Sequence, residues 1–108
     1  MAEEKKPERR GGDRVSLVDT VQFTEVRTST NWKARLYDVS STGCYIEIMN
    51  PPPENAEIRV RLDLRGEMFE ARAVVVRCEL NMGMAVRFLE IDAANQKILE
   101  KFLAQSRS

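Results

Sequence analysis

The feature that most constrains this fold is an alternation of apolar and polar residues with a period of two. It is clearest where the apolar residues Ile58, Val60, Leu62 and Leu64 alternate with Arg59, Arg61, Asp63 and Arg65. Successive side chains of a β-strand point to opposite faces. This segment is therefore predicted to be a strand with one face in a core and the other face in water.

Similar patterns occupy most of the chain. Further strands are expected at Val21 to Val26, Trp32 to Asp38, Cys44 to Ile48, 67–78 and Met84 to Phe88. In the second of these, Trp32, Ala34, Leu36 and Asp38 alternate with polar residues and are expected to share one face. Glycine, serine and asparagine indicate turns at 40–43, 65–66 and 81–83, and three consecutive prolines at 51–53 predict a loop.

Only the end of the chain has helical periodicity. Asp92 is a plausible N-cap, and the apolar residues that follow it recur every three to four positions: Ala94, Ile98, Leu99, Phe102 and Leu103. Six strands and then one helix, without β-α-β alternation, favour an all-β fold. We expect a six-stranded antiparallel β-barrel with a C-terminal α-helix, whose apolar stripe covers the open end of the barrel.

The length of 108 residues suits one domain. We expect a flexible N-terminal tail at 1–8, the domain at 9–104 and a C-terminal tail at 105–108. The charged start has no apolar run of the kind that a signal peptide contains, and no segment resembles a membrane-spanning helix. These observations predict a soluble, cytoplasmic protein without membrane insertion.

Composition excludes several kinds of chemistry. The chain has no histidine, which removes histidine-dependent catalysis and most zinc sites, so no catalytic residue and no metal site is predicted. Cys44 and Cys78 are expected to be small buried residues in a reducing compartment, with a disulfide as the less favoured alternative. The 17 basic and 17 acidic residues balance to a formal net charge of +0, whereas a dedicated nucleic-acid binder usually has a basic surplus.

Two polar clusters stand apart from the predicted barrel. The first is the run at 9–14, in which Arg10 and Arg14 lie on a segment rich in glycine. Two guanidinium groups on such a segment can converge on one ligand, and they suit phosphate oxygens and the edge of guanine. The alternative is a solvated tail, in which Glu8 and Asp13 offset the positive charge.

The second cluster is Asp38, Ser40 and Gly43, at the turn between two strands. Aspartate accepts hydrogen bonds from guanine N–H groups, serine can donate to a phosphate, and glycine permits positive φ or a close approach to the backbone. The alternative is a turn whose side chains satisfy their own backbone groups.

Taken together, the two clusters resemble the PilZ domain family. That family has the motif RxxxR, here Arg10 to Arg14, followed by (D/N)xSxxG, here Asp38, Ser40 and Gly43. Residues 83–88 resemble a further segment of the family, and the resemblance covers roughly residues 8 to 104. It implies a non-enzymatic receptor for the second messenger cyclic di-GMP, with no cofactor besides this ligand.

The resemblance also implies a role for each motif residue. Arg10 and Arg14 would clamp the ligand, Asp38 would accept from the guanine amine and imine, Ser40 would make a polar contact, and Gly43 would leave room. Arg9, directly before the motif, implies that two stacked ligand molecules bind. Gly11, Gly12 and Asp13 replace the bulkier residues common in the family, which raises the expected cost of ordering this segment.

A lone receptor domain would act by changing conformation and signalling to a protein partner, which the sequence does not identify. One alternative is a PilZ-like protein-interaction module that binds no nucleotide. Another is a small nucleic-acid-binding barrel that uses Arg59, Arg61, Arg65 and Arg72, although the balanced charge counts against it. We expect these arginines to form cross-strand ion pairs. Trp32, Met82 and Met84 are expected to be packing residues, whereas Arg77 and Arg87 are candidates to extend the anion site.

Overall fold

Six strands and one helix follow one another in the computed structural model, which describes residues 15–106 of the chain. The elements are β1 (Val15–Glu25), β2 (Thr30–Val39), β3 (Gly43–Glu47), β4 (Glu57–Leu64), β5 (Glu67–Glu79), β6 (Gly83–Glu90) and α2 (Ala93–Ser106). The predicted strands and the C-terminal helix are all present. The helix extends to Ser106, two residues beyond the expected end of the domain.

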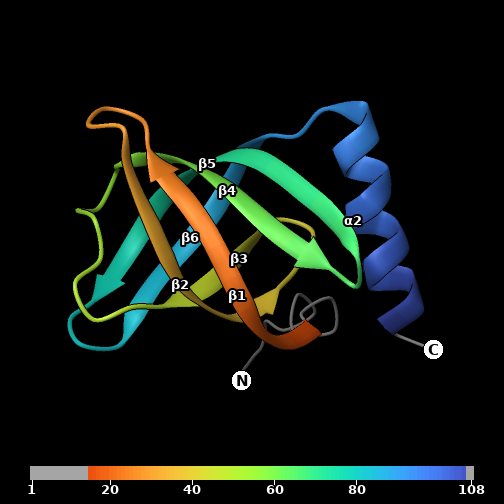
Figure 1. The fold of residues 1–108 in the computed structure, drawn as a ribbon, viewed down its shortest axis with the longest axis horizontal. Coiled ribbons are helices and arrows are strands. Elements are labelled where there is room, and N and C mark those ends of the chain that lie inside the picture. The colour runs from red at the N-terminus through yellow and green to blue at the C-terminus, as the bar shows by residue number, and fades with distance from the viewer. Residues whose placement is uncertain (1–14, 107–108) are drawn as a thin grey trace, which may run out of the picture.

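The strands close into an antiparallel barrel in the order β1-β2-β3-β6-β5-β4 (Figure 1). Closure comes from pairing of β1 with β4, with Val21 opposite Leu62 and Phe23 opposite Val60. The expected fold class, an all-β six-stranded antiparallel barrel with a C-terminal helix, is confirmed. Closing the sheet pairs the backbone groups that an open edge would leave exposed.

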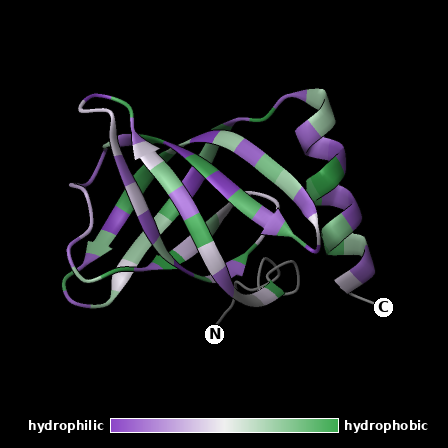
Figure 2. Cartoon of the chain, in the orientation of Figure 1, coloured by the Kyte–Doolittle hydropathy of each residue, from purple (hydrophilic) through white to green (hydrophobic). Residues whose placement is uncertain are grey.

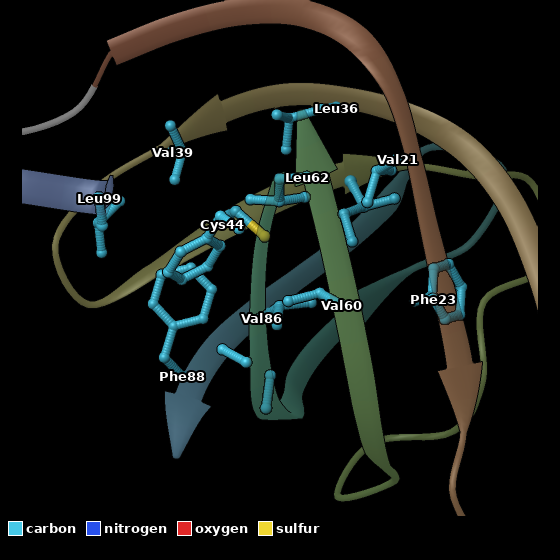
Figure 3. Packing of buried hydrophobic residues seen from close by; sticks show 14 of the residues in the cluster. Val21, Phe23, Leu36, Val39, Cys44, Val60, Leu62, Val86, Phe88 and Leu99 are labelled. Carbon is cyan, nitrogen blue, oxygen red and sulfur yellow. The ribbon is translucent and has the colours of Figure 1, made fainter. Parts of the chain in front are cut away.

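The core lies inside the barrel, where the inward-facing apolar side chains of the six strands pack against one another. Along β4 the buried and exposed residues alternate without a break, as the hydrophobicity pattern predicted. Figure 2 shows this alternation as bands of hydrophobic and hydrophilic residues along the strands. Figure 3 shows the interior, in which Leu36, Val39, Leu62 and Val86 contribute side chains from β2, β4 and β6.

Helix α2 covers one end of the barrel, next to β4 and β5 (Figure 1). Asp92 caps it as expected, because its Oδ1 accepts a hydrogen bond from the backbone N–H of Asn95 at 2.8 Å. The buried face consists of Leu99, Phe102 and Leu103. Ile98 is only partly buried and Ala94 is exposed, so the apolar stripe is narrower than predicted.

The turn at 65–66 has the backbone conformation that its residues predict. Arg65 and Gly66 have φ values of 56° and 94°, which suits the hairpin between β4 and β5. Trp32 stacks on Phe23 with ring centroids 5.7 Å apart, which confirms a packing role. Met84 is also buried, but Met82 is 64% exposed, so its expected packing role is wrong because the β5–β6 hairpin carries it away from the core.

Two other expectations concern single residues. Val26 lies beyond the end of β1 and is exposed, so the first strand ends one residue earlier than predicted. Cys44 is buried and Cys78 is half-buried, and the structure contains no disulfide between them, as the favoured expectation held. Among the described residues, no helix combines the length and the apolar character that crossing a bilayer requires.

Candidate functional site

An irregularity in β2 turns Asp38 to the outside of the barrel. Leu36 pairs with Ile46 and Asp38 pairs with Tyr45. The two pairs are two residues apart on β2 but only one residue apart on β3, so β2 contains one extra residue here. Such a bulge resets the alternation of the strand. The next residue, Val39, points into the core with Cys44 (Figure 3). The expectation that Asp38 shares a face with Leu36 is therefore wrong.

Asp38 is buried even though it lies on the outer side of the barrel. Asp38 is only 7% exposed. In the sheet it pairs with Ser16 of β1 on one side and with Tyr45 of β3 on the other. Burying a charged carboxylate without hydrogen-bond donors costs free energy, so a carboxylate in this position is stabilised by accepting hydrogen bonds. This placement is compatible with recognition of N–H donors on a base.

The turn after β2 is held by Ser40. Its backbone N–H donates to the carbonyl of Gly43 at 2.8 Å, and its hydroxyl lies 3.3 Å from the same carbonyl. The backbone N–H of Thr42 in turn donates to the Ser40 hydroxyl at 3.3 Å. Ser40 is 1% exposed, so these contacts give it the structural role of a turn-stabilising serine.

Gly43 is required by a close approach within the protein. A Cβ atom at this position would lie 2.0 Å from the backbone carbonyl oxygen of Val86 on β6, a distance that no side chain could occupy. Its φ is not in the left-handed region, so steric space and not backbone conformation selects glycine here. The predicted room for a ligand stays a prediction, because this contact concerns only the packing of β3 on β6.

Two aromatic rings border the turn on the outer face. Tyr37 and Tyr45 meet edge to face, with centroids 6.1 Å apart. The Tyr45 hydroxyl donates a hydrogen bond to Glu79, and burial together with this bond raises the pKa of Tyr45 to about 12. The ring also covers Gly83, where a Cβ would lie within 2.8 Å of it. Tyr45 is therefore fixed, whereas Tyr37 is exposed and can contact a base by stacking.

Two arginines complete the outer face. Ala85 lies opposite Tyr45, and Arg77 lies opposite Ala85 on β5. Arg87 lies directly opposite Gly43. The small residues Gly43 and Ala85 thus lie between Asp38 and the tyrosines on one side and the arginines on the other. This set can stack on a base, accept from it and attract a phosphate.

The structure brings together three of the six predicted ligand-binding residues, Asp38, Ser40 and Gly43. The other three, Arg9, Arg10 and Arg14, lie outside the described residues. Sequence reasoning missed Tyr37 and Tyr45 because an aromatic residue in a strand is most often a packing residue. Their common position on the outer face depends on the bulge in β2, which the sequence pattern does not reveal.

The basic stripe on β4 and β5 has a different character. Arg61 pairs with Glu70 at 3.0 Å, and Arg72 lies between Glu57 at 2.7 Å and Glu90 at 2.6 Å. Arg65 stacks over the ring of Phe102 on α2, 5.4 Å from its centroid. The expected cross-strand ion pairs are confirmed for Arg61 and Arg72. Among the described residues, Arg59 and Arg65 form no such pair, so the expectation is wrong for these two. Because Arg61 and Arg72 are neutralised by carboxylates, the stripe does not form a continuous phosphate track for a nucleic acid.

Comparison with known proteins gives one family match and several similar structures. The family model described as "PilZ domain" matches residues 8–105. The PilZ domain of CeSA from a cellulose-synthesizing bacterium has 15% identity and a TM-score of 0.67, and the match covers 85% of this chain and 95% of that chain. No curated protein matches the sequence significantly.

Two other solved structures match over part of their length. The inhibitor of motility MotI/DgrA from Bacillus subtilis has 20% identity and a TM-score of 0.69, with 86% of this chain and 48% of that chain covered. The Borreliella burgdorferi protein PlzA, solved in complex with c-di-GMP, has 8% identity and a TM-score of 0.65, with 84% and 39% covered. At these identities the likeness shows the fold alone, and the chain spans less than half of both proteins.

Proposed function

The chain belongs to the PilZ domain family, and from this premise we propose that it is a receptor for cyclic di-GMP. In this proposal the protein is not an enzyme. It binds the second messenger in the cytoplasm, changes conformation and signals to a protein partner. Asp38, Ser40, Gly43 and the arginines of 9–14 form the ligand site.

The observation that carries the proposal is the position of Asp38 beside the turn of Ser40 and Gly43. The bulge in β2 places this carboxylate on the outer side of the barrel, next to two tyrosine rings. A guanine base offers N–H donors for a carboxylate and a flat face for an aromatic ring. The solved complex of PlzA with c-di-GMP, a protein of the same fold, supports the choice of ligand.

The RxxxR segment supplies the remaining contacts in the proposal. Arg10 and Arg14 precede β1 by only a few residues, and Ser16 of β1 lies opposite Asp38. A segment that continues from Val15 therefore starts next to the turn. Guanidinium groups on it would bind phosphate oxygens and the O6 and N7 edge of guanine, while Asp38 binds the opposite edge.

Calorimetric titration with cyclic di-GMP tests the proposal, with cyclic di-AMP and GTP as controls. We expect saturable heat for cyclic di-GMP and none for cyclic di-AMP, because adenine lacks the N1–H and N2 amine donors that Asp38 accepts from guanine. GTP carries the same base without the second nucleotide or the cyclic backbone, so an absence of heat with GTP would show that the cyclic dinucleotide, and not guanine alone, is recognised. Circular dichroism checks that the barrel is folded in the same samples. A folded protein that shows no heat at high micromolar ligand would reject the receptor and favour the nucleotide-free interaction module.

The clamp is tested with Arg10→Ala and Arg14→Ala. Each should weaken binding by more than about tenfold, because a hydrogen bond to a charged group contributes roughly 1.5 to 3 kcal/mol. Neither should change the melting temperature without ligand, because residues 8–14 contain no large apolar side chain that could join the core. Arg27→Ala, at the exposed hairpin between β1 and β2, is the matched control and should bind normally. Wild-type affinity in Arg14→Ala would refute the clamp.

A further inference from the structure

Arg87 differs from the other arginines on this side of the barrel because no acidic residue of the described chain pairs with it. Arg35 pairs with Glu47 at 3.7 Å and Arg77 pairs with Glu79 at 3.5 Å. Within residues 15–106, no carboxylate lies within 4.0 Å of the Arg87 guanidinium. An unneutralised guanidinium next to a binding site is available for an anion.

The position of Arg87 is fixed by its strand. Val86 and Phe88 point into the core, so Arg87 points outward from β6 (Figure 3). It lies opposite Gly43 of β3, where no side chain can exist because the Val86 carbonyl occupies the space. Arg87 itself is exposed, next to the turn that holds Gly43.

A hollow of about 390 Å³ lies beside Arg87, between the β2–β3 turn and the start of α2. Ser41 and Thr42 line it on the turn side and Gln96 lines it on the helix side. Glu90 also lines the hollow, but its carboxylate accepts a hydrogen bond from Arg72 at 2.6 Å. Arg87 is the one cation among the described residues that line the hollow, together with hydroxyl and amide donors.

We propose that Arg87 forms a phosphate subsite that extends the cyclic di-GMP site from the turn toward α2. The proposal rests on the receptor function above. Cyclic di-GMP carries two phosphates on opposite sides of its ring, so a cation on a second side of the site can bind the phosphate that faces it. The arginines of 9–14 precede β1, whereas Arg87 projects from β6 on the other side of the turn. The two sets can therefore bind different phosphates of the bound ligand.

The test compares cyclic di-GMP titrations of the wild type, Arg87→Ala and Arg87→Lys. We expect Arg87→Ala to weaken binding about tenfold, the effect of one charge-assisted hydrogen bond. Arg87→Lys keeps the charge and should recover part of that loss. Arg59→Ala is the matched control, because Arg59 also points outward from a strand, on β4, and should bind within about twofold of the wild type.

A dependence on salt separates a phosphate contact from a structural role. The gap in affinity between wild type and Arg87→Ala should shrink as the salt concentration rises, because salt screens the attraction of an exposed guanidinium for phosphate. A gap that does not change with salt would overturn the subsite. Equal affinities for wild type and Arg87→Ala would also overturn it and leave the receptor function intact.

Two further results would overturn the subsite. An equal loss in Arg59→Ala would show that overall charge, and not Arg87, sets the affinity. If the folded wild type binds no cyclic di-GMP, the receptor function fails and the subsite fails with it. These results are distinguishable, because only the last abolishes binding in every variant.

Discussion

At the scale of single residues, Gly43 connects the ligand motif to the stability of the barrel. Glycine is selected here by the Val86 carbonyl oxygen, which lies 2.0 Å from the position of a Cβ. Gly43 also lies opposite Arg87, so the same residue borders the proposed phosphate subsite. A motif residue can thus be required by packing and by binding together, and a sequence motif alone does not separate the two requirements.

Gly43→Ala should therefore lower stability before any ligand is added. The methyl group must push β3 away from β6, and overpacking of this kind costs typically about 1 to 3 kcal/mol in the free energy of unfolding. Denaturant titration measures the loss. Gly66 provides the matched control, because a Cβ there meets nothing within 4 Å and only its φ of +94° resists substitution. Gly66→Asn should cost less, since asparagine tolerates positive φ. Unchanged stability in Gly43→Ala would contradict the steric role.

At the scale of elements, the sequence predicted the strands better than it predicted their faces. The alternation in β4 is unbroken, and its pattern alone identified the buried residues. In β2 the same reasoning placed Asp38 on the inner face with Leu36, but the bulge opposite Tyr45 turns Asp38 to the outer face. A bulge is set by the pairing of two strands, whereas an alternation pattern describes only one. For the same reason the sequence suggested Arg87 as a candidate but could not place it beside Gly43.

The hydrogen bond from Tyr45 of β3 to Glu79 of β5 also predicts a dependence of stability on pH. The pKa of Tyr45 is raised to about 12, above the ordinary value of 10.0. The folded protein therefore holds this proton more tightly than the unfolded chain does, and the stabilisation is fully present below pH 10. It is lost as the pH rises from about 10 to about 12.

Unfolding measurements on the wild type and Tyr45→Phe should reveal this loss. The difference in the free energy of unfolding between them should be constant below pH 10 and should fall toward pH 12, because the phenylalanine has no proton to lose. Comparing the two proteins removes the contribution of lysines, which titrate in the same range. A difference that stays constant up to pH 12 would show that neither burial nor the hydrogen bond to Glu79 raises the pKa of Tyr45 in the folded protein.

At the scale of the whole molecule, the number of cations near the turn bears on how many ligands bind. Two stacked molecules of cyclic di-GMP would bring four phosphates into a small volume, more charge than Arg10 and Arg14 can offset. Arg9 adds a third guanidinium from the same segment, and it can bind a phosphate or stack on an outer guanine. In the proposed phosphate subsite, Arg87 adds a fourth guanidinium from β6. Glu8 and Asp13 reduce the positive charge available to the ligand, because each can neutralise an arginine of the segment.

We therefore expect two molecules of cyclic di-GMP per chain. Ordering the backbone of residues 8–14 costs on the order of 1 to 2 kcal/mol per residue, with the two glycines at the upper end. A stacked pair offers more contacts to offset that cost than a single molecule does. Calorimetry of the wild type and of Arg9→Leu measures the ratio of ligand to chain. A ratio of one in the wild type would reject the paired mode, and a ratio of two that survives Arg9→Leu would keep the pair but remove Arg9 as its cause. If Arg9 is the cause, the ratio should fall from two to one in Arg9→Leu while the first molecule still binds through Arg10 and Arg14.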